Sequence, residues 1–478
     1  MWDYIVVGAG PSGLSLAWYL SKYNKTVLVV DQNDSLGGCH RVTRVNGIFT
    51  EHGPRIYLSA YLVFRELLED MGLNFNDLFT EYNFNISSIG GESISTMEVR
   101  ELWAFTKGYL WLTFNPNYGR GISVLEFMIK NDFSEGTKEY VNRFCLMTDG
   151  ATSTNYTLFE FLQLLNQKLF YKIYQPKLPN DIGLFAFWEK ALIRTGRVKI
   201  LLNTSVSKLQ GGGNLINSLV TNRGTIYGRN FILAIPPKNI TELLAASGPV
   251  ADAFGPIDQL KKFSINNSYI DYLPIVYHWD KKLVLPKILG FPKSEWGVAF
   301  IELSNYIVFR ENISKTVITT CITLADIPSS KTGKTANNST KSELINEVHR
   351  QLKETFTNLP PPTFATLSPF VYRFGNKWVN KDTAYVLTPN NQFLEQQSNR
   401  YPNLYNVGTH NGYQKYYSTS FESAVSNSVA LVNKIIPQSK DEIKIHEPFS
   451  MTKAINIMIG LIFGIIVLIV LYKAGYTL

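Results

Sequence analysis

The chain has 478 residues, a formal charge of +8 and 45% hydrophobic residues. It is too long for one compact core, so at least two domains are expected. Its Lys and Arg residues are scattered, whereas nucleic-acid-binding faces usually show clusters, so a nucleic acid is not expected as a partner. Cys39, Cys145 and Cys321 lie far apart and show neither a disulfide framework nor zinc-ligand spacing, which suits a reducing compartment.

The first 31 residues have the pattern of a strand, a helix and a second strand. Trp2–Val7 is an apolar run that ends at Gly8, residues 12–23 have helical periodicity, and residues 26–30 form a buried strand that ends at Asp31. Such a unit predicts a parallel sheet with the helix packed against it. The predicted fold class is therefore α/β, with a Rossmann-type domain at the start of the chain.

The glycine-rich turn between the first strand and the helix predicts a dinucleotide site. Gly8 permits a tight turn, Gly10 lets the backbone approach a pyrophosphate, and Gly13 lets the helix pack closely on the strand. The helix that begins at Ser12 offers free N–H groups and the positive end of its dipole to the phosphates. Asp31 ends the second strand, where its carboxylate can accept hydrogen bonds from ribose hydroxyls.

The remaining chain alternates helical and strand patterns. Helices are expected over residues 60–72, 157–174 and 420–435, strands over 197–209, 231–234 and 404–407, a glycine turn at 211–213, and a polar surface loop over 327–343. The segment from about 80 to 180 is rich in aromatic residues, which suit either a large core or an apolar substrate cavity.

The C-terminal tail has the composition of a membrane span. Residues 454–472 carry no charge and are flanked by Lys453 and Lys473. About 20 apolar residues suffice for a helix to cross a bilayer. Since only five residues follow Lys473, the pattern is that of a single-pass tail anchor whose preceding domains face the cytosol. Gly460 and Gly464 are spaced for helix pairing, so a homodimer is an alternative state.

These motifs resemble the flavin-containing amine oxidase superfamily, which includes monoamine oxidases, protoporphyrinogen oxidase and phytoene desaturase. That family follows its ribose-binding acid with a pair of glycines and an arginine, and it uses FAD. Here the pair is Gly37 and Gly38, the next residue is Cys39, and the nearest arginine is Arg41. The resemblance implies that Arg41 is the arginine near the cofactor.

The resemblance extends to three later segments. Residues 51–57 are similar to the stretch that passes the isoalloxazine ring, Val206 matches a valine whose backbone meets the adenine, and residues 402–432 resemble the closing flavin motif, in which a helix points its N-terminus at the ring. The cofactor-binding residues implied are Gly8, Gly10, Ser12, Gly13, Asp31, Gln32, Gly38, Arg41, Gly53, Pro54, Arg55, Val206, Gly408, Thr409, Ser420 and Phe421.

Catalytic residues are less clearly marked. Amine oxidases carry a lysine near the flavin, but the comparable stretch, residues 269–279, contains none, and Lys261 and Lys262 are the nearest lysines before it. The weak candidates are His410, Tyr416 and Tyr417. For His410 a structural or ribityl-contacting role is preferred over that of a base, because hydride transfer to a flavin often needs no protein base.

The resemblance implies a Rossmann-type FAD-binding domain interleaved with a mixed α+β substrate domain, followed by a transmembrane helix. The FAD-binding domain is expected over residues 1–80, 181–250 and 396–436, the substrate domain over 81–180 and 251–395, a linker over 437–453 and the membrane helix over 454–472.

The function implied is that of an FAD-dependent oxidoreductase on a membrane, which passes a hydride from an amine or CH–CH substrate to flavin N5. No cysteine follows Cys321, so the FAD is expected to be held non-covalently. One alternative is a flavin-dependent isomerase resembling UDP-galactopyranose mutase, which residues 53–57 also resemble. Another is a non-catalytic binding protein of the same fold, as in the Rab escort proteins, although the intact glycine turn argues against it. The expected partners are a small-molecule substrate and the lipid bilayer.

Overall fold

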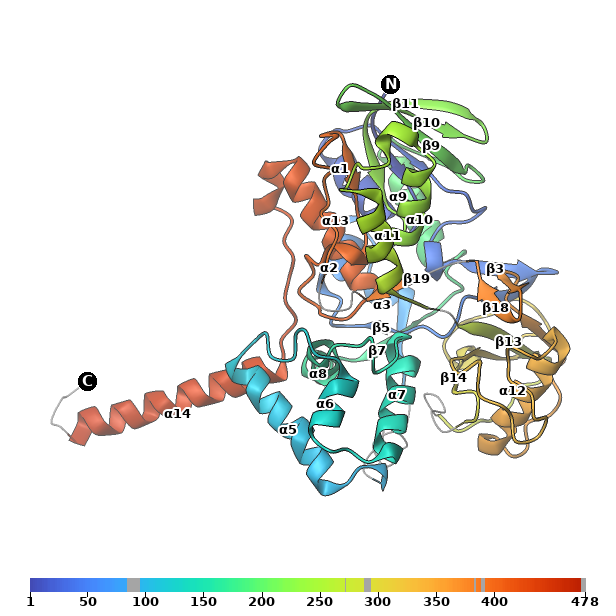
Figure 1. Ribbon diagram of the computed structural model, residues 1–478, viewed down its shortest axis with the longest axis vertical. Helices are drawn as coiled ribbons and strands as arrows, with labels where there is room; N and C mark the ends of the chain where they lie inside the picture. The colour runs from blue at the N-terminus through green and yellow to red at the C-terminus, as the bar shows by residue number, and fades with distance from the viewer. Residues whose placement is uncertain (84–94, 271, 288–293, 382–383, 388–391, 474–478) are drawn as a thin grey trace.

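The computed structural model describes residues 1–83, 95–270, 272–287, 294–381, 384–387 and 392–473 (Figure 1). Its main sheet has seven strands, with neighbours in the order β8, β2, β1, β11, β10 and β9, and with β20 also paired to β11. The bounds are β1 Trp2–Val7, β2 Val27–Val30, β8 Val198–Leu201, β9 Val206–Gly212, β10 Leu215–Thr221, β11 Gly224–Leu233 and β20 Leu404–Asn406.

The parallel part of this sheet is buried on both faces. Four strands run parallel in the order β8, β2, β1 and β11, and β20 adds a fifth beside β11. Alternate side chains point to opposite faces, which is why β2 is wholly apolar and the buried ends of β1 and β11 are apolar as well. One face packs against helices α1 Pro11–Lys22, α2 Leu62–Asp70, α9 Leu184–Arg194 and α13 Phe421–Ile435, and the other against α10 Pro237–Ala245 and α11 Ile257–Asn266.

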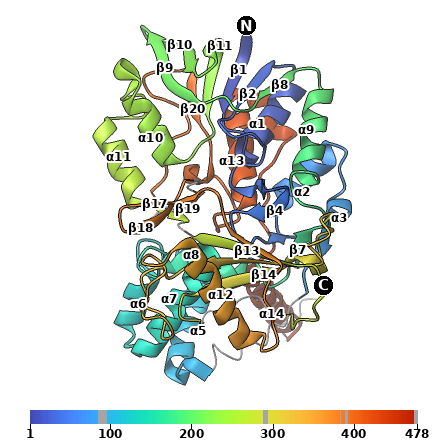
Figure 2. The same ribbon diagram turned by 90° about the vertical axis from the view of Figure 1, so that its right-hand side faces the viewer.

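The remainder of the structure forms two further parts below the sheet (Figure 2). One is a helical part made of α5 Val99–Phe114, α6 Val124–Lys130, α7 Glu135–Asp149 and α8 Leu158–Asn166 around an aromatic core. The other is an antiparallel sheet of β14 Val298–Glu302, β15 Thr316–Ile322, β13 Leu273–Trp279 and β16 Phe364–Leu367, packed on α12 Lys341–Thr355. The smaller elements are β3 Val42–Val45, β4 Ile48–Glu51, β5 Tyr57–Leu58, α3 Phe75–Leu78, β6 Phe79–Glu81, β7 Ile173–Pro176, β12 Ser268–Ile270, β17 Val371–Phe374, β18 Lys377–Asn380 and β19 Ala384–Leu387.

The expected helix over residues 157–174 was too long. Helix α8 ends at Asn166, and residues 173–176 form strand β7, which pairs with β5 and β6. Strand pairing across the chain therefore prevailed over local helical periodicity. The glycine turn was also misplaced, because Gly211 and Gly212 belong to strand β9 and only Gly213 lies in the turn.

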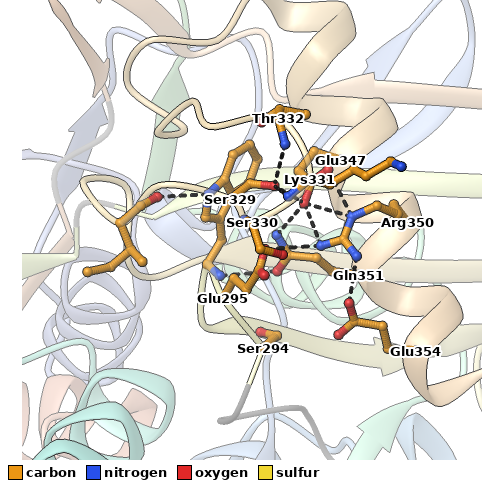
Figure 3. Close-up of polar contacts among 12 residues, drawn as sticks. Ser294, Glu295, Ser329, Ser330, Lys331, Thr332, Glu347, Arg350, Gln351 and Glu354 are labelled. Carbon is orange, nitrogen blue, oxygen red and sulfur yellow. Dashed lines mark hydrogen bonds and ion pairs between the residues drawn. The ribbon is translucent and has the colours of Figure 1, made fainter.

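Residues 327–340 of the predicted polar loop form a folded turn held against α12 (Figure 3). The last three residues of that prediction, 341–343, are the first turn of α12. The Ser329 hydroxyl donates to the Glu347 carboxylate at 2.8 Å, and Arg350 donates to the same carboxylate and to that of Glu295. Burial would raise the pKa of Glu347, but the hydrogen bonds and the charge of Arg350 hold it below its ordinary value. This turn is therefore a packed part of the region formed by α12 and the antiparallel sheet.

The segment 437–453 joins α13 to the last helix and is packed on the body of the protein. The Tyr23 hydroxyl donates to the Glu442 carboxylate at 2.6 Å, and the Phe449 amide donates to the Tyr171 hydroxyl at 2.7 Å. These contacts hold the segment between α13 and α14 against the rest of the protein.

The last helix, α14 Met451–Lys473, projects away from the rest of the molecule (Figure 1). Residues 451–469 have a mean hydropathy of 2.3 and are not buried in the structure, so this helix is long and apolar enough to cross a membrane. It starts three residues before the predicted boundary.

Candidate functional site

A cavity of about 640 Å³ lies at the carboxyl edge of the parallel strands. Its lining includes Val7 and Val30 at the ends of β1 and β2, Ala234 after β11 and Val407 after β20. Because parallel strands end at one edge of the sheet, the loops that follow them converge there. Ligands of open α/β sheets bind in this position.

The three glycines of the first turn have different surroundings. A Cβ on Gly8, which has φ +112°, would lie 2.3 Å from the Ala234 carbonyl oxygen, and a Cβ on Gly13 would lie 2.0 Å from the Gly8 carbonyl oxygen. A Cβ on Gly10 would meet no atom nearer than Gly38 Cα, at 3.7 Å. Gly8 and Gly13 are therefore required by the protein's own packing, whereas Gly10 keeps the wall of the cavity open.

Two helices begin at this cavity and are held side by side. The first residues of α1 and of α13, including Ser12 and Ser420, line it. The Ser12 hydroxyl donates to the Ala424 carbonyl at 3.3 Å, and the Ser428 hydroxyl donates to the Ser12 carbonyl at 2.8 Å. Both N-termini thus present positive dipole ends to one space, which favours an anionic ligand.

Asp31 lies at the cavity wall with its carboxylate already oriented. One oxygen accepts the N–H of Ala9 at 2.7 Å, and the other accepts the N–H of Asn33 at 2.8 Å. Oδ1 also accepts from the Asn33 side-chain amide at 2.9 Å, so Oδ2 is the oxygen that keeps a lone pair for a ligand hydroxyl. Gln32 lines the cavity beside it.

Two arginines line the same cavity. Arg41 is buried, donates to the Gly38 carbonyl at 3.0 Å and stacks on Phe370 with its guanidinium carbon 4.3 Å from the ring centre. Arg55 Nε lies 3.9 Å from the Glu51 carboxylate, and among the described residues neither Nε nor Nη2 of Arg55 has a hydrogen-bond partner. A buried guanidinium with unused donors suits an acceptor-rich ligand.

Burial shifts two neighbours of Arg55. It raises the pKa of Glu51 to about 7, against the opposing charge of Arg55, and it lowers the pKa of His52 to about 3, with the charges of Arg55 and Arg41 adding to the effect. His52 is therefore neutral at physiological pH, and Arg41 and Arg55 give this wall a positive character.

Most of the residues predicted from the sequence come together in this cavity. Those that line it are Gly8, Gly10, Ser12, Asp31, Gln32, Gly38, Arg41, Gly53, Pro54, Arg55, Val206, Gly408, Thr409, His410, Tyr416, Ser420 and Phe421. Gly13 does not line it, because it packs helix α1 on strand β1. Tyr417 does not line it either, because its ring packs on Phe159 and near Arg120.

His410 is buried and its Nε2 lies 2.9 Å from Asn406 Oδ1. Burial lowers its pKa to about 3, so the imidazole is neutral at physiological pH and a weak base. This environment supports a structural role. Tyr416 is also buried, and its ring meets that of Tyr61 edge-on with centroids 5.4 Å apart.

Several lining residues come from segments that the sequence did not single out. They include Asp149 at the end of α7, Lys168 after α8, and Lys381. Asp149 accepts a hydrogen bond from the Ser418 hydroxyl at 3.0 Å, which ties α7 to the loop before α13. No local motif marks these residues. Lys261 and Lys262, which the sequence suggested, are exposed on α11 outside the cavity.

The buried histidines predict a measurable dependence of stability on pH. The folded-state pKa of His410, about 3, lies below its ordinary value of 6.5, so the unfolded chain binds more protons between these values. Its contribution to stability should be lost as pH falls from 6.5, with a slope of up to about 1.4 kcal/mol per pH unit. The raised pKa of Glu51 acts in the opposite direction between pH 4.5 and about 7, so a variant must isolate the effect.

We therefore expect His410→Gln to reduce the slope of unfolding free energy against pH between 6.5 and 5 by about that amount, as measured by urea titration in detergent. His446→Gln, at the surface beside Glu66, is the matched control and should keep the slope of the parent chain. Equal slopes for the parent chain and His410→Gln would show that folding does not lower the pKa of His410 and would contradict the prediction.

Comparison with known proteins agrees with this architecture. Residues 6–71 match the model of the NAD(P)-binding Rossmann-like domain. The chain is 32% identical over 77 residues to an L-amino-acid oxidase of Sistrurus catenatus edwardsii, covering 16% of this chain and 15% of that protein. It is 33% identical over 118 residues to a phytoene desaturase of Neurospora crassa, covering 22% and 20%. A UDP-galactopyranose mutase of Mycoplasma genitalium is 40% identical over 58 residues, covering 12% and 14%.

Matched segments thus span a fifth or less of each of these relatives. Similarity to solved structures extends over nearly the whole chain. A putative protoporphyrinogen oxidase from Exiguobacterium has a TM-score of 0.61 at 14% identity and covers 91% of this chain and 98% of that one. Cyclohexylamine oxidase from Brevibacterium oxydans has a TM-score of 0.60 at 14% identity and covers 91% and 99%. The chain therefore shares the fold of these solved oxidases, and its residues 6–71 match an NAD(P)-binding Rossmann-like domain.

Proposed function

We propose that the chain is an FAD-dependent oxidoreductase of the flavin amine oxidase type that binds FAD non-covalently in the cavity described above. The observation that carries this proposal is the turn at Gly10, which is open to the cavity while the glycines on either side are closed by the protein's own backbone. A glycine that the fold itself does not require, at the start of helix α1, is what close approach of a pyrophosphate demands.

Each part of the cavity suits one part of FAD. The turn at Gly10 and the N-terminus of α1 would hold the pyrophosphate, and Asp31 with Gln32 would hold a ribose. Val206 opens strand β9 at the cavity and would meet the adenine through its backbone. The remaining predicted residues, Gly38, Arg41, Gly53, Pro54, Arg55, Gly408, Thr409, Ser420 and Phe421, would surround the rest of the cofactor.

Bound FAD would supply hydride acceptance at N5, from an amine or a CH–CH substrate. The chain would contribute positioning and electrostatics. The N-terminus of α13, capped by the Ser420 hydroxyl that accepts the Ser423 N–H at 3.2 Å, would favour negative charge on the ring. Neutral His410 would pack and orient the closing loop and would not take a proton.

The substrate would lie against residues that the helical part of the chain brings to the cavity. Asp149, Lys168 and Tyr416 line it from that side. Burial lowers the pKa of Lys168, with the charge of Asp149 opposing the shift. Opposite charges on one wall suit a substrate that carries a polar or charged group beside its reacting carbon.

Two other functions fit the fold less well. An isomerase similar to the UDP-galactopyranose mutases would bind FAD in the same way, but that relative matches only 58 residues, and no observation in the cavity favours its chemistry over hydride transfer. A non-catalytic protein of this fold would not need Gly10 open to the cavity or the Asp31 carboxylate held at its wall.

We further propose that α14 anchors the chain in a membrane with the FAD-binding domain on the cytosolic side. Helix α14 is apolar over residues 451–469 and unburied in the structure, and its backbone groups are satisfied within the helix. Among the described residues, none would lie within 4 Å of a Cβ on Gly460 or Gly464, so this face of the helix is open and a homodimer through it stays a prediction.

The oxidoreductase proposal predicts a flavin that its substrate bleaches. Purified full chain, kept without oxygen, should lose its yellow absorption on addition of one member of a panel of amines, L-amino acids, isoprenoid CH–CH compounds and porphyrinogens. Readmission of oxygen or of an artificial electron acceptor should restore it. The isomerase would be favoured if no compound of the panel bleached the flavin, dithionite did bleach it, and the reduced protein converted a nucleotide sugar.

Non-covalent binding predicts that acid precipitation releases all the flavin into the supernatant. Cys145 and Cys321 are buried and do not line the cavity, but Cys39 does line it. The matched variant is Cys39→Ser. Yellow colour that stays in the pellet for the parent chain but not for Cys39→Ser would assign a covalent bond to Cys39 and contradict the prediction.

Gly10→Val should abolish flavin binding without unfolding the protein. A Cβ on Gly10 would lie 3.7 Å from Gly38 Cα, its nearest described neighbour, so the backbone has room for the substitution, and flavin content should fall at least about tenfold with an unchanged circular dichroism spectrum. Gly136→Val, at an open position in α7, is the control and should keep its flavin. Full flavin content in Gly10→Val would show that the pyrophosphate of FAD does not bind at this turn.

The anchor proposal predicts that a stop codon after Ser450 converts an integral protein into one that alkaline carbonate extracts from membranes. Residues 437–450 pack on the body, so the cut is placed after Ser450, where α14 begins. All cavity-lining residues precede the cut, and the shortened chain should keep its flavin. Protease added outside intact microsomes should digest the flavin domain of the full chain, and protection of that domain would show the inverse topology.

A further inference from the structure

A ring of large apolar side chains is exposed around the base of α14. Three segments contribute to this basal ring, and the exposed fractions of its members run from 42% to 70%. The basal ring consists of Leu110, Trp111 and Phe114 on α5, Leu165, Leu169 and Phe170 at and after the end of α8, and Phe449 just before α14. Apolar side chains gathered in this way on a soluble surface mark a contact with something else.

Polar contacts fix the basal ring to the point where α14 leaves the protein. The Thr452 amide donates to Asn166 Oδ1 at 2.9 Å, and Asn456 Nδ2 donates to the Thr113 carbonyl at 3.4 Å. The Phe449 amide donates to the Tyr171 hydroxyl. These bonds join the first turns of α14 to the C-terminal ends of α5 and α8, as Figure 1 shows for α5. The basal ring and α14 therefore form one continuous apolar surface.

The free length of α14 is short for a bilayer. Because Asn456 still contacts α5, only residues 457–472 stand clear of the body before Lys473. At 1.5 Å per residue these cover roughly 24 Å, whereas the hydrocarbon core is about 30 Å thick. An inserted α14 would therefore draw its base, and the basal ring with it, down to the membrane surface.

The exposed side of α5 has the chemistry of a membrane interface. It carries Trp103, Trp111 and Phe114, together with Lys107, whose ammonium lies 5.8 Å from the Trp103 ring centre. Glu101, the acidic residue within α5, is buried on the other side. Tryptophan rings and lysine side chains are the groups that settle at the boundary between headgroups and acyl chains.

We propose that the basal ring is a second membrane-contacting surface, which lies in the interfacial layer of the bilayer and holds the flavin domain face-on to the membrane. This inference rests on the proposed anchoring by α14. Lys168, between two members of the basal ring, lines the cavity from inside, so docking would place the helical wall of the cavity at the bilayer. The occupant of the basal ring is the lipid surface and not a second copy of the chain.

The test uses the full chain in vesicles of phosphatidylcholine and phosphatidylserine. In a Cys39→Ser background, single cysteines at positions 111, 114 and 169 carry an environment-sensitive fluorophore. Controls of similar exposure stand at Tyr227 on β11 and Phe374 on β17, and Phe463 within α14 reports insertion. Lipids with a spin-label quencher on the upper acyl chain should reduce the fluorescence of the three basal-ring labels at least about twofold and leave the labels at 227 and 374 nearly unchanged.

The label at Phe463 separates failure of this inference from failure of the anchor. Quenching at 463 without quenching at 111, 114 and 169 would contradict membrane contact by the basal ring and would support insertion of α14. No quenching at any of these positions would overturn both. Quenching in the basal ring without quenching at 463 would support docking and contradict the anchor. Basal-ring labels shielded from water but unaffected by the lipid quencher would mean that a second copy covers them, which also overturns the inference.

Discussion

The convergence of two helix N-termini on one edge of a parallel sheet is the constraint on which the rest of the structure depends. The serine contacts between helices α1 and α13 join residues that are 412 and 416 positions apart in the chain, and both involve Ser12 in the first turn of α1. Strand β20 pairs with β11 just before α13 begins, which brings the closing segment to the same sheet edge as α1. The cavity is thus the space that two positive dipole ends share, and it forms only when the ends of the chain meet.

Burial decides the chemistry of the cavity wall more than charge pairing does. His52 and His410 are both neutral because desolvation disfavours their charged forms, and the carboxyl of Glu51 has a raised pKa despite the nearby guanidinium of Arg55. The wall therefore presents fixed positive arginines and neutral imidazoles. Under the proposed function, such a wall would stabilise negative charge on a bound ring.

The helical part of the chain links the cavity to the tail. Helix α7 ends at Asp149 on the cavity wall, and α8 leads to Lys168 on the same wall and to Asn166, which binds the first turn of α14. These helices share one aromatic core, so the same packing supports Asp149 on the cavity wall and the base of α14. A substitution in that core should therefore affect both the cavity wall and the base of α14.

The sequence by itself determined the dinucleotide turn, the strands at 2–7 and 27–30, the closing helix and the apolar tail, because each is coded by local spacing: alternating burial, glycines at fixed positions, or an unbroken apolar run. Only the tertiary structure shows what surrounds each glycine of the turn: a Cβ on Gly8 or Gly13 would meet backbone, whereas a Cβ on Gly10 would have room. It also decided that residues 173–176 form a strand, because their partners lie about a hundred residues earlier. Asp149 and Lys168 reach the cavity through packing between segments that no local pattern connects.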